Sequence, residues 1–499
     1  MISFRAVARF SAVFLFLFDL GGPGVALAAD GSVGGYFRVM TRPDFQGGDG
    51  KLGYWNLYGR LMNEGPYAAL HSQLELLEQR PGAGDVWARV HAQVEGSTVT
   101  GADSGGGALS QMRLSQLYTE VGNVLGPEII IRVGTLESWM GDLGLYDWRP
   151  TSLLGDTVGM SGTVRGESYD LLIGIGDAGF NHNPDRYNTL FSGGGSLRFR
   201  PIDQVEVGIG AQFRYEPAVV GNVNAPYHTP EVDYSDWLRG EVISVWAAEN
   251  PGQLQNFPDP VSNSADSSKL VGYLGFGGVG PLVWNSLFVS YERLHPDSIT
   301  TEVFEDVEYE LFVSELTDER SVLTVAEELH LTIMPNVAEL VMSAIYGLHV
   351  DGDNSVAPSD HARSYISTVN RLQLFLTPGF HLLVEGSLAK ESSTNGNQYR
   401  DHSDSIFESS GGVSDSRGLE YGDASVRHTA QGKLGLVLNP SGAGIFTRPS
   451  LRLLYGTQWS SQSNAFGNSF VDSLDQYNSF GNVERHWHHM VSAETEVWF

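Results

Sequence analysis

The sequence predicts an all-β protein, an antiparallel barrel that crosses a membrane with about 16–20 strands. Apolar and polar residues alternate with a period of two over many segments of about ten residues. Short turns and long polar stretches alternate between these segments. The chain of 499 residues contains 60 glycines, no cysteine and 11% aromatic residues. An excess of glycine and aromatic residues is typical of membrane barrels, whose outer faces carry aromatic girdles.

The N-terminal residues predict a secretory signal peptide. Arg5 and Arg9 precede an apolar run at about 10–18, and Ala26-Leu27-Ala28 forms a small-residue cleavage pattern. Cleavage after Ala28 leaves one barrel domain at 29–499, without a second domain or a linker. The mature part contains no apolar run near 18 residues, so we expect no transmembrane helix.

The net charge of −29 opposes binding to nucleic acid, because the phosphate backbone would be repelled. In a membrane barrel this charge indicates acidic external loops and a lumen that favours cations. The alternative is that the charge serves only to keep the loops soluble.

Hairpins are the repeated unit of the pattern. Leu197 and Phe199 alternate with Arg198 and Arg200 before a turn at 201–204. The other short turns are expected at 334–336, 377–379 and 439–444, and the long polar stretches at 181–194, 216–235, 250–266, 351–362, 391–423 and 459–484. Short turns at one end and long loops at the other predict periplasmic turns and external loops.

The chain ends in a strand, VSAETEVWF. Its apolar face is formed by Val491, Ala493, Thr495, Val497 and Phe499, whereas Trp498 shares the other face with Glu494 and Glu496. Backbone groups in lipid must be paired internally, so the sheet must close. We therefore expect the last strand to pair with the first, near 33–40, with its apolar face against lipid.

Three aromatic residues are predicted to face the lumen. Tyr36 and Trp498 lie opposite the apolar faces of the first and last strands, and Tyr67 alternates with Leu70 and Leu74. Arg38 follows the same face, and the alternation in NLYGRLM at 56–62 places Arg60 beside it, opposite Leu57 and Leu61. A sugar ring stacks on such aromatics while its hydroxyls bond guanidinium and carboxylate groups. The alternative is an interfacial girdle whose rings point inward.

Metal and catalytic motifs are weak. His486 and His488 share one strand face without a third ligand, and 349–354 lacks the terminal glutamate of a calcium loop. No spacing indicates a nucleophile with its base, and no glycine-rich phosphate loop is present. We expect no metal, no cofactor, no catalytic residue and no catalysed reaction.

Four stretches, GGYFR at 34–38, RLMNEGPYAAL at 60–70, GTLESWMGDLGLYDW at 134–148 and TEVWF at 495–499, resemble the maltoporin family of sugar-specific outer-membrane porins. The resemblance implies a homotrimer of barrels of about 18 strands in the outer membrane that passes maltose or maltodextrin-type sugars by facilitated diffusion. It places Tyr36, Tyr67 and Trp498 on an aromatic path, Arg38 and Arg60 on a polar track, and Asp142, Asp147 and Arg149 in an inward-folded constriction loop.

The chain departs from the family pattern at several positions. Met140 replaces an arginine, Arg149 a tyrosine and Ala69 a glutamate, and residues 96–112 contain no tryptophan. A general or cation-leaning diffusion porin without sugar specificity therefore stays open as an alternative. An outer-membrane barrel enzyme, such as a lipase or protease, and an adhesin or receptor are further alternatives.

Overall fold

The computed structural model describes residues 30–43, 45, 52, 56–77, 85–97, 112–126, 128–179, 190–217, 264–296, 300–304, 307–311, 320–351, 363–393, 426–461 and 486–499. The predicted signal peptide, much of the long polar stretches and residues 352–354 of the weak calcium motif lie outside this part of the chain.

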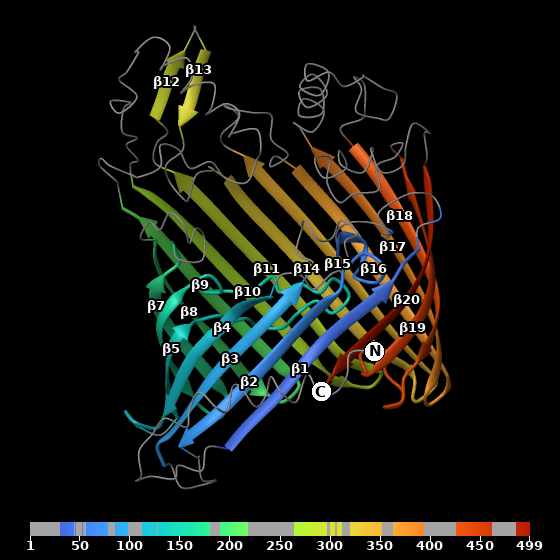
Figure 1. The fold of residues 1–499 in the computed structure, drawn as a ribbon, viewed down its shortest axis with the longest axis horizontal. Coiled ribbons are helices and arrows are strands. Elements are labelled where there is room, and N and C mark those ends of the chain that lie inside the picture. The colour runs from blue at the N-terminus through green and yellow to red at the C-terminus, as the bar shows by residue number, and fades with distance from the viewer. Residues whose placement is uncertain are drawn as a thin grey trace.

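The described strands form an 18-stranded antiparallel barrel, within the range that the sequence predicts (Figure 1). The strands are β1 (Asp30–Thr41), β2 (Tyr67–Leu77), β3 (Trp87–Ser97), β4 (Met112–Gly122), β5 (Ile129–Thr135), β6 (Val158–Arg165), β7 (Tyr169–Asp177), β8 (Phe191–Ile202), β9 (Val205–Glu216), β10 (Ala265–Val279), β11 (Leu282–Pro296), β14 (Arg320–Met334), β15 (Ala338–Asp351), β16 (Arg363–Thr377), β17 (Phe380–Ser393), β18 (Val426–Leu438), β19 (Ser450–Ser460) and β20 (Trp487–Trp498). A separate hairpin of β12 (Thr300–Phe304) and β13 (Val307–Leu311) stands beyond one rim, at the top of Figure 1.

The barrel closes between the first and the last strand, as predicted. β1 pairs antiparallel with β20, and Tyr36 lies opposite Trp498. The backbone of Phe499 exchanges two hydrogen bonds with Gly35, at 2.9 and 3.0 Å. A Cβ atom at Gly35 would lie 2.5 Å from the Phe499 ring, so only glycine leaves room for this ring on the outer face. The terminal residue is therefore held in the sheet.

Connections alternate in length around the barrel. At one end two residues join β8 to β9 (203–204), β10 to β11 (280–281) and β16 to β17 (378–379). At the other end much longer stretches of chain join the strands, for example 217–264 and 394–425. This is the predicted arrangement of short turns and long loops. None of the helical segments in the described residues has the length and hydropathy of a membrane-spanning helix.

Several boundaries differ from the sequence prediction. Residues 191–194, predicted as part of a loop, belong to β8, and its turn is confined to 203–204. The run Ser192-Gly193-Gly194-Gly195 resembles a loop because it has no apolar side chain, yet it pairs fully with β7 and β9. Small side chains suffice here because half of these positions face the lumen, where no apolar contact is needed.

The outer face is apolar and the inner face largely polar. Outward positions carry exposed residues such as Ile173, Ile209 and Leu388, whereas inward positions carry residues such as Arg371 and Glu385. In a closed barrel the backbone groups of every strand are hydrogen-bonded to a neighbouring strand, and no unpaired edge meets lipid. With its apolar outer face, the chain therefore has the architecture of an outer-membrane barrel. The largest apolar cluster lies inside the barrel, where chain segments pack against the wall formed by β10 to β17.

Candidate pore constriction and solute path

The segment between β5 and β6, residues 136–157, folds into the barrel. Leu143, Leu145 and Tyr146 are buried in the internal cluster with Phe288 of β11 and Val369 of β16. These apolar side chains anchor the segment because the wall opposite them is also apolar. The predicted inward position of the constriction loop is therefore correct.

Glu328 of β14 fixes the tip of this loop. Its carboxylate accepts hydrogen bonds from the backbone N–H groups of Gly144, at 3.0 Å, and Leu145, at 2.9 Å. The tip itself turns between Leu143 and Trp148, which form an isolated β-bridge. Asp147 in this turn has a positive φ of 53°, a conformation that is uncommon outside turns for residues other than glycine.

A second segment, between β1 and β2, also folds into the barrel, which the sequence reasoning missed. Residues 56–58 form a 3-10 helix and residues 59–66 are irregular, so the strand-like alternation predicted at 56–62 is wrong. The apolar residues of this segment do not face lipid. Leu57, Leu61 and Met62 are buried against the inner wall of the barrel. The backbone N–H of Arg60 donates to the carbonyl of Leu145 at 2.9 Å, which joins the two inward segments.

A third segment, the short connection at 439–449, fills the same side of the lumen. Ile445 belongs to the internal apolar cluster, and its N–H donates to Glu339 at 3.0 Å. The Arg448 guanidinium lies 2.6 Å from Glu496 of β20. A Cβ at Gly144 would meet the Phe446 ring at 2.8 Å, so this connection touches the loop tip. Together the three segments pack against the inner wall from β7 to β20.

Charged residues link the loop tip to the opposite wall. Arg38 of β1 contacts the Glu64 carboxyl group and lies 3.5 Å from Asp147. Arg60 forms an ion pair with Glu496 and lies 3.7 Å from Asp147. The two arginines predicted to form a polar track therefore lie together. Each is also paired with carboxylates, which leaves fewer donors for a solute than the sequence reasoning supposed.

The pKa values of two carboxyl groups in this cluster, those of Glu64 and Asp147, are shifted in opposite directions. Burial raises the pKa of Glu64 to about 8, although Arg38 opposes the shift. Partial burial also acts on Asp147, but Arg60 and Arg38 outweigh it and hold its pKa below the usual value. Asp147 keeps half of its side chain exposed to the lumen. The constriction therefore presents at least one stable negative charge at neutral pH.

The three predicted aromatic residues form one continuous cluster. The Tyr36 ring lies 4.6 Å from Trp498 and 5.7 Å from Tyr67, centroid to centroid. Tyr36 is buried, whereas Trp498 is 60% exposed. The Tyr36 hydroxyl donates to Glu496 at 2.9 Å, and the Tyr67 hydroxyl donates to Glu95 at 2.8 Å. An exposed indole beside carboxylate acceptors is thus available on the inner wall.

The remaining candidate residues of the loop face the lumen in part. Asp142 is exposed, and Arg149 stacks over the Trp139 ring at 3.9 Å and pairs with Glu137 at 3.5 Å. Met140 is buried on the wall side, against Gly208. Arg149 is therefore held by contacts within the loop.

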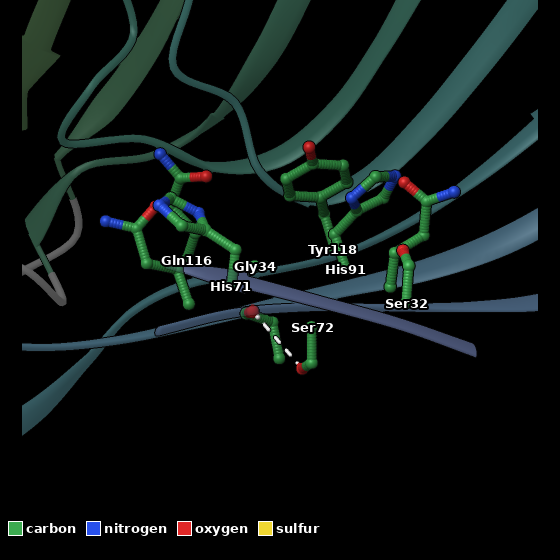
Figure 2. Close-up of a pocket in the computed structure, with 10 residues that line it drawn as sticks. Ser32, Gly34, His71, Ser72, His91, Gln116 and Tyr118 are labelled. Carbon is green, nitrogen blue, oxygen red and sulfur yellow. Dashed lines mark hydrogen bonds between the residues drawn. The ribbon is translucent and has the colours of Figure 1, made fainter. Parts of the chain in front are cut away.

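The wall from β1 to β4 carries the pocket shown in Figure 2, a cavity of about 250 Å³. Its polar side chains on the lumen face are Ser32, His71, Gln73, His91, Gln93, Gln116 and Tyr118. His91 stacks on Tyr118 with centroids 4.6 Å apart, and the Arg132 guanidinium lies 4.2 Å from the Tyr118 ring. Ser72, which donates to the Ala92 carbonyl, lies on the other face of the sheet (Figure 2). Among the described residues, none from β1 to β4 belongs to the two apolar clusters with which the inward segments pack.

Metal ligation finds no support in the described residues, which contain no group of three or more histidine, cysteine or acidic residues arranged to hold an ion. His488 is buried and faces the lumen, and His486 contacts the Ser460 carbonyl at 2.9 Å. The weak histidine motif thus gains no third ligand among these residues.

Comparison with known proteins finds likeness only in structure. No protein-family model matches the chain. No curated protein matches it. The solved structures that resemble it include the outer membrane channel DcaP of Acinetobacter baumannii, with 8% identity, a TM-score of 0.43, and coverage of 96% of this chain and 100% of that chain. OprD of Pseudomonas aeruginosa has 9% identity and a TM-score of 0.38, with 94% and 96% covered.

Wzi of Escherichia coli, an outer membrane protein involved in capsule assembly and called a carbohydrate-binding β-barrel, has 12% identity, a TM-score of 0.39, and coverage of 99% and 87%. All of these TM-scores lie below 0.5. The fold described above therefore rests on the strand pairing of this chain itself. The maltoporin resemblance stays a prediction.

Proposed function

We propose that this chain is an outer-membrane porin that passes small sugars by facilitated diffusion. The observation that carries the proposal is the cluster of Tyr36, Tyr67 and Trp498 on the inner wall, beside the paired charges of Arg38, Arg60 and Asp147. An exposed indole offers a face for a pyranose ring, and the nearby carboxylates accept bonds from its hydroxyls.

The proposed mechanism is weak, successive binding along the wall. Stacking on an aromatic ring contributes about 1–3 kcal/mol, by analogy with base stacking. Lost water and lost solute freedom offset part of this gain. A site that binds weakly suits transport because tight binding would retain the solute. Nothing in this mechanism requires a cofactor or a bond-breaking step.

A general, cation-leaning porin is the second candidate. It is favoured by the contacts of Arg38 and Arg60, whose guanidinium groups are already engaged by the carboxyl groups of Glu64, Glu496 and Asp147. In that case the exposed carboxylates of Asp142 and Asp147 set the selectivity of the constriction.

Uptake into liposomes separates the two candidates. The purified barrel is reconstituted with a panel of maltose-type oligosaccharides and with linear polyols of similar mass. The sugar-specific function predicts that sugars enter faster than polyols and that rates saturate as sugar concentration rises. Rates that depend only on solute mass, without saturation, would leave the general porin as the function.

A further inference from the structure

The outer face carries a polar patch in the middle of one wall. Glu327 lies at the centre of β14 and is exposed, because its neighbours Ala326 and Glu328 both face the lumen. Thr368 and Asn370 lie on the outer face of β16, since Val369 between them is buried inside. We call Glu327, Thr368 and Asn370 the β14–β16 patch.

The patch lies within the apolar band and not at a rim. On its own strand Glu327 is flanked by outward-facing Val325, 41% exposed, and further along by Ile333, 54% exposed. On the neighbouring strands Tyr346 and Ile366 are outward and exposed. A carboxylate that faces lipid at this depth is unfavourable, because no water or donor is available to it.

The barrel itself satisfies this polar group only in part. Asn285 of β11 donates from Nδ2 to Glu327 Oε1 at 3.1 Å. The Asn285 Oδ1 atom is buried, and it finds no hydrogen-bond partner among the described residues. The exposed Glu327 carboxylate therefore still has acceptor capacity for donors from outside the barrel.

Another wall shows what the lipid-facing surface looks like elsewhere. On β7 and β9 the corresponding mid-strand positions carry Ile173, 61% exposed, and Ile209, 59% exposed. Over the described part of β5 to β9, the mid-strand outward positions carry no charged or amide side chain. The polar groups are thus concentrated on one side of the barrel.

We propose that a second copy of this chain covers the β14–β16 patch. The patch is self-complementary: Glu327 supplies acceptors on one side of β15, and Thr368 and Asn370 supply donors on the other side. Ala344 of β15 pairs with both Glu327 and Thr368, and its short side chain projects little from the outer surface between them. A Cβ at Gly386, beside Asn370, would meet nothing within 4 Å, so the surface there is open.

In this contact the carboxylate of Glu327 in one copy accepts hydrogen bonds from Asn370 and Thr368 of the next copy. Acyl chains of lipid carry no such donors, whereas this wall carries acceptor and donors at fixed spacing. A contact of this kind closes into a symmetric assembly of two or three copies. The proposal does not depend on which solute the pore passes.

Cysteine pairs test the contact directly, because the chain has no cysteine of its own. The test variant carries Glu327→Cys and Asn370→Cys. These positions lie two strands apart and are offset by two residues along the strand, about 12 Å, which is too far for a bond within one copy. The matched control carries Ile173→Cys and Ile209→Cys, with the same spacing on the apolar wall.

Copper phenanthroline is added to outer membranes that contain either variant, and covalent products are separated on a denaturing gel. The proposal predicts covalent dimers or trimers of the test pair at ~10-fold or more above the control pair. Equal amounts of product from both pairs, or none from either, would overturn it. Heat-modifiable migration of each variant confirms that the barrels are folded.

A second pair of variants measures the energy of the contact. Glu327→Leu removes the acceptor, whereas Glu327→Gln keeps the shape and one acceptor oxygen. We expect Glu327→Leu to weaken self-association in detergent ~10–100-fold and Glu327→Gln to weaken it less. Unchanged self-association of the leucine variant would show that lipid or another molecule covers the patch.

Discussion

Asp147, at the tip of the inward loop, lies 3.5 Å from Arg38 of the first strand, although 109 residues separate them in the chain. The contact means that the loop crosses the lumen from its attachment at β5 and β6 to the wall at β1. Because Glu328 holds the other side of the tip, the loop is fixed at both walls. The charged groups at the loop tip are therefore held in place inside the lumen.

Neutralising the exposed loop carboxylates tests this arrangement. In the double variant Asp142→Asn, Asp147→Asn, we expect the ratio of cation to anion permeability to fall roughly two- to tenfold, about 0.4–1.4 kcal/mol. The measurement is the reversal potential across a planar bilayer in a salt gradient. Asp170→Asn, a lumen carboxylate of β7 paired with Arg200, serves as the control and should leave the ratio nearly unchanged. An unaltered ratio in the double variant would remove the loop from the selectivity mechanism.

Selectivity should also depend on pH through Glu64. Its pKa in the folded barrel is about 8, above the ordinary value, so it is neutral below this pH and ionised above it. Because Glu64 holds its proton more tightly in the folded state than in the unfolded state, protonation of Glu64 stabilises the fold. This contribution to the free energy of unfolding is lost as pH rises from about 4.5 through about 8. Ionisation adds a negative charge beside Arg38, so cation preference should rise over the upper part of this window.

Reversal potentials recorded between about pH 6 and about pH 10 check this prediction. Glu64→Gln should remove the step near pH 8 while the pore still conducts. A step of the same size in the glutamine variant would place the titration on another group.

The attachment of the loop tip can be weakened at a single residue. In Glu328→Gln, one of the two backbone N–H groups of Gly144 and Leu145 loses its carboxylate acceptor. A hydrogen bond to a charged group contributes about 1.5–3 kcal/mol, so the tip should move more freely. We expect larger current fluctuations of single open channels and a higher mean conductance. Glu75→Gln, on the wall of β2 away from the loop, should leave the noise unchanged.

Stability should depend on a buried charge cluster in the wall. Glu385 lies between Arg371, at 2.6 Å, and Lys433, at 2.7 Å, and all three side chains are buried. Replacing Glu385 by alanine leaves two buried cations unpaired, which costs about 3–5 kcal/mol. Urea unfolding of the barrel in detergent should show this loss. The control Glu75→Ala, at a more exposed position of the same lumen, should change the midpoint little.

Alternation in the sequence was sufficient to predict the barrel, its closure and the direction of its terminal side chains. Val497 and Phe499 alternate with Glu496 and Trp498, and a pleated strand converts such alternation directly into two faces. The inward loop was predicted through its resemblance to a family and not through its periodicity. Its apolar residues, such as Leu143 and Leu145, contact a wall that only the closed barrel creates.

The second inward segment escaped prediction for the same reason. Leu57 and Leu61 around Arg60 alternate like a strand, but their apolar partners are Val369, Leu383 and Val437, more than 300 residues away in the chain. Glu64 escaped because a single glutamate in a polar stretch carries no pattern. Its partnership with Arg38 exists only when the segment folds back into the lumen.

The most direct test of the proposed function is the block of single-channel current by maltose-type oligosaccharides. Wild-type channels should be blocked at millimolar sugar, and Trp498→Ala should raise the blocking constant ~5–100-fold with little change in open-channel conductance. Trp487→Ala, on the outer face of the same strand, is the matched control and should block like the wild type. Absence of block in the wild type, or equal block in all three proteins, would contradict a sugar path over Tyr36, Tyr67 and Trp498.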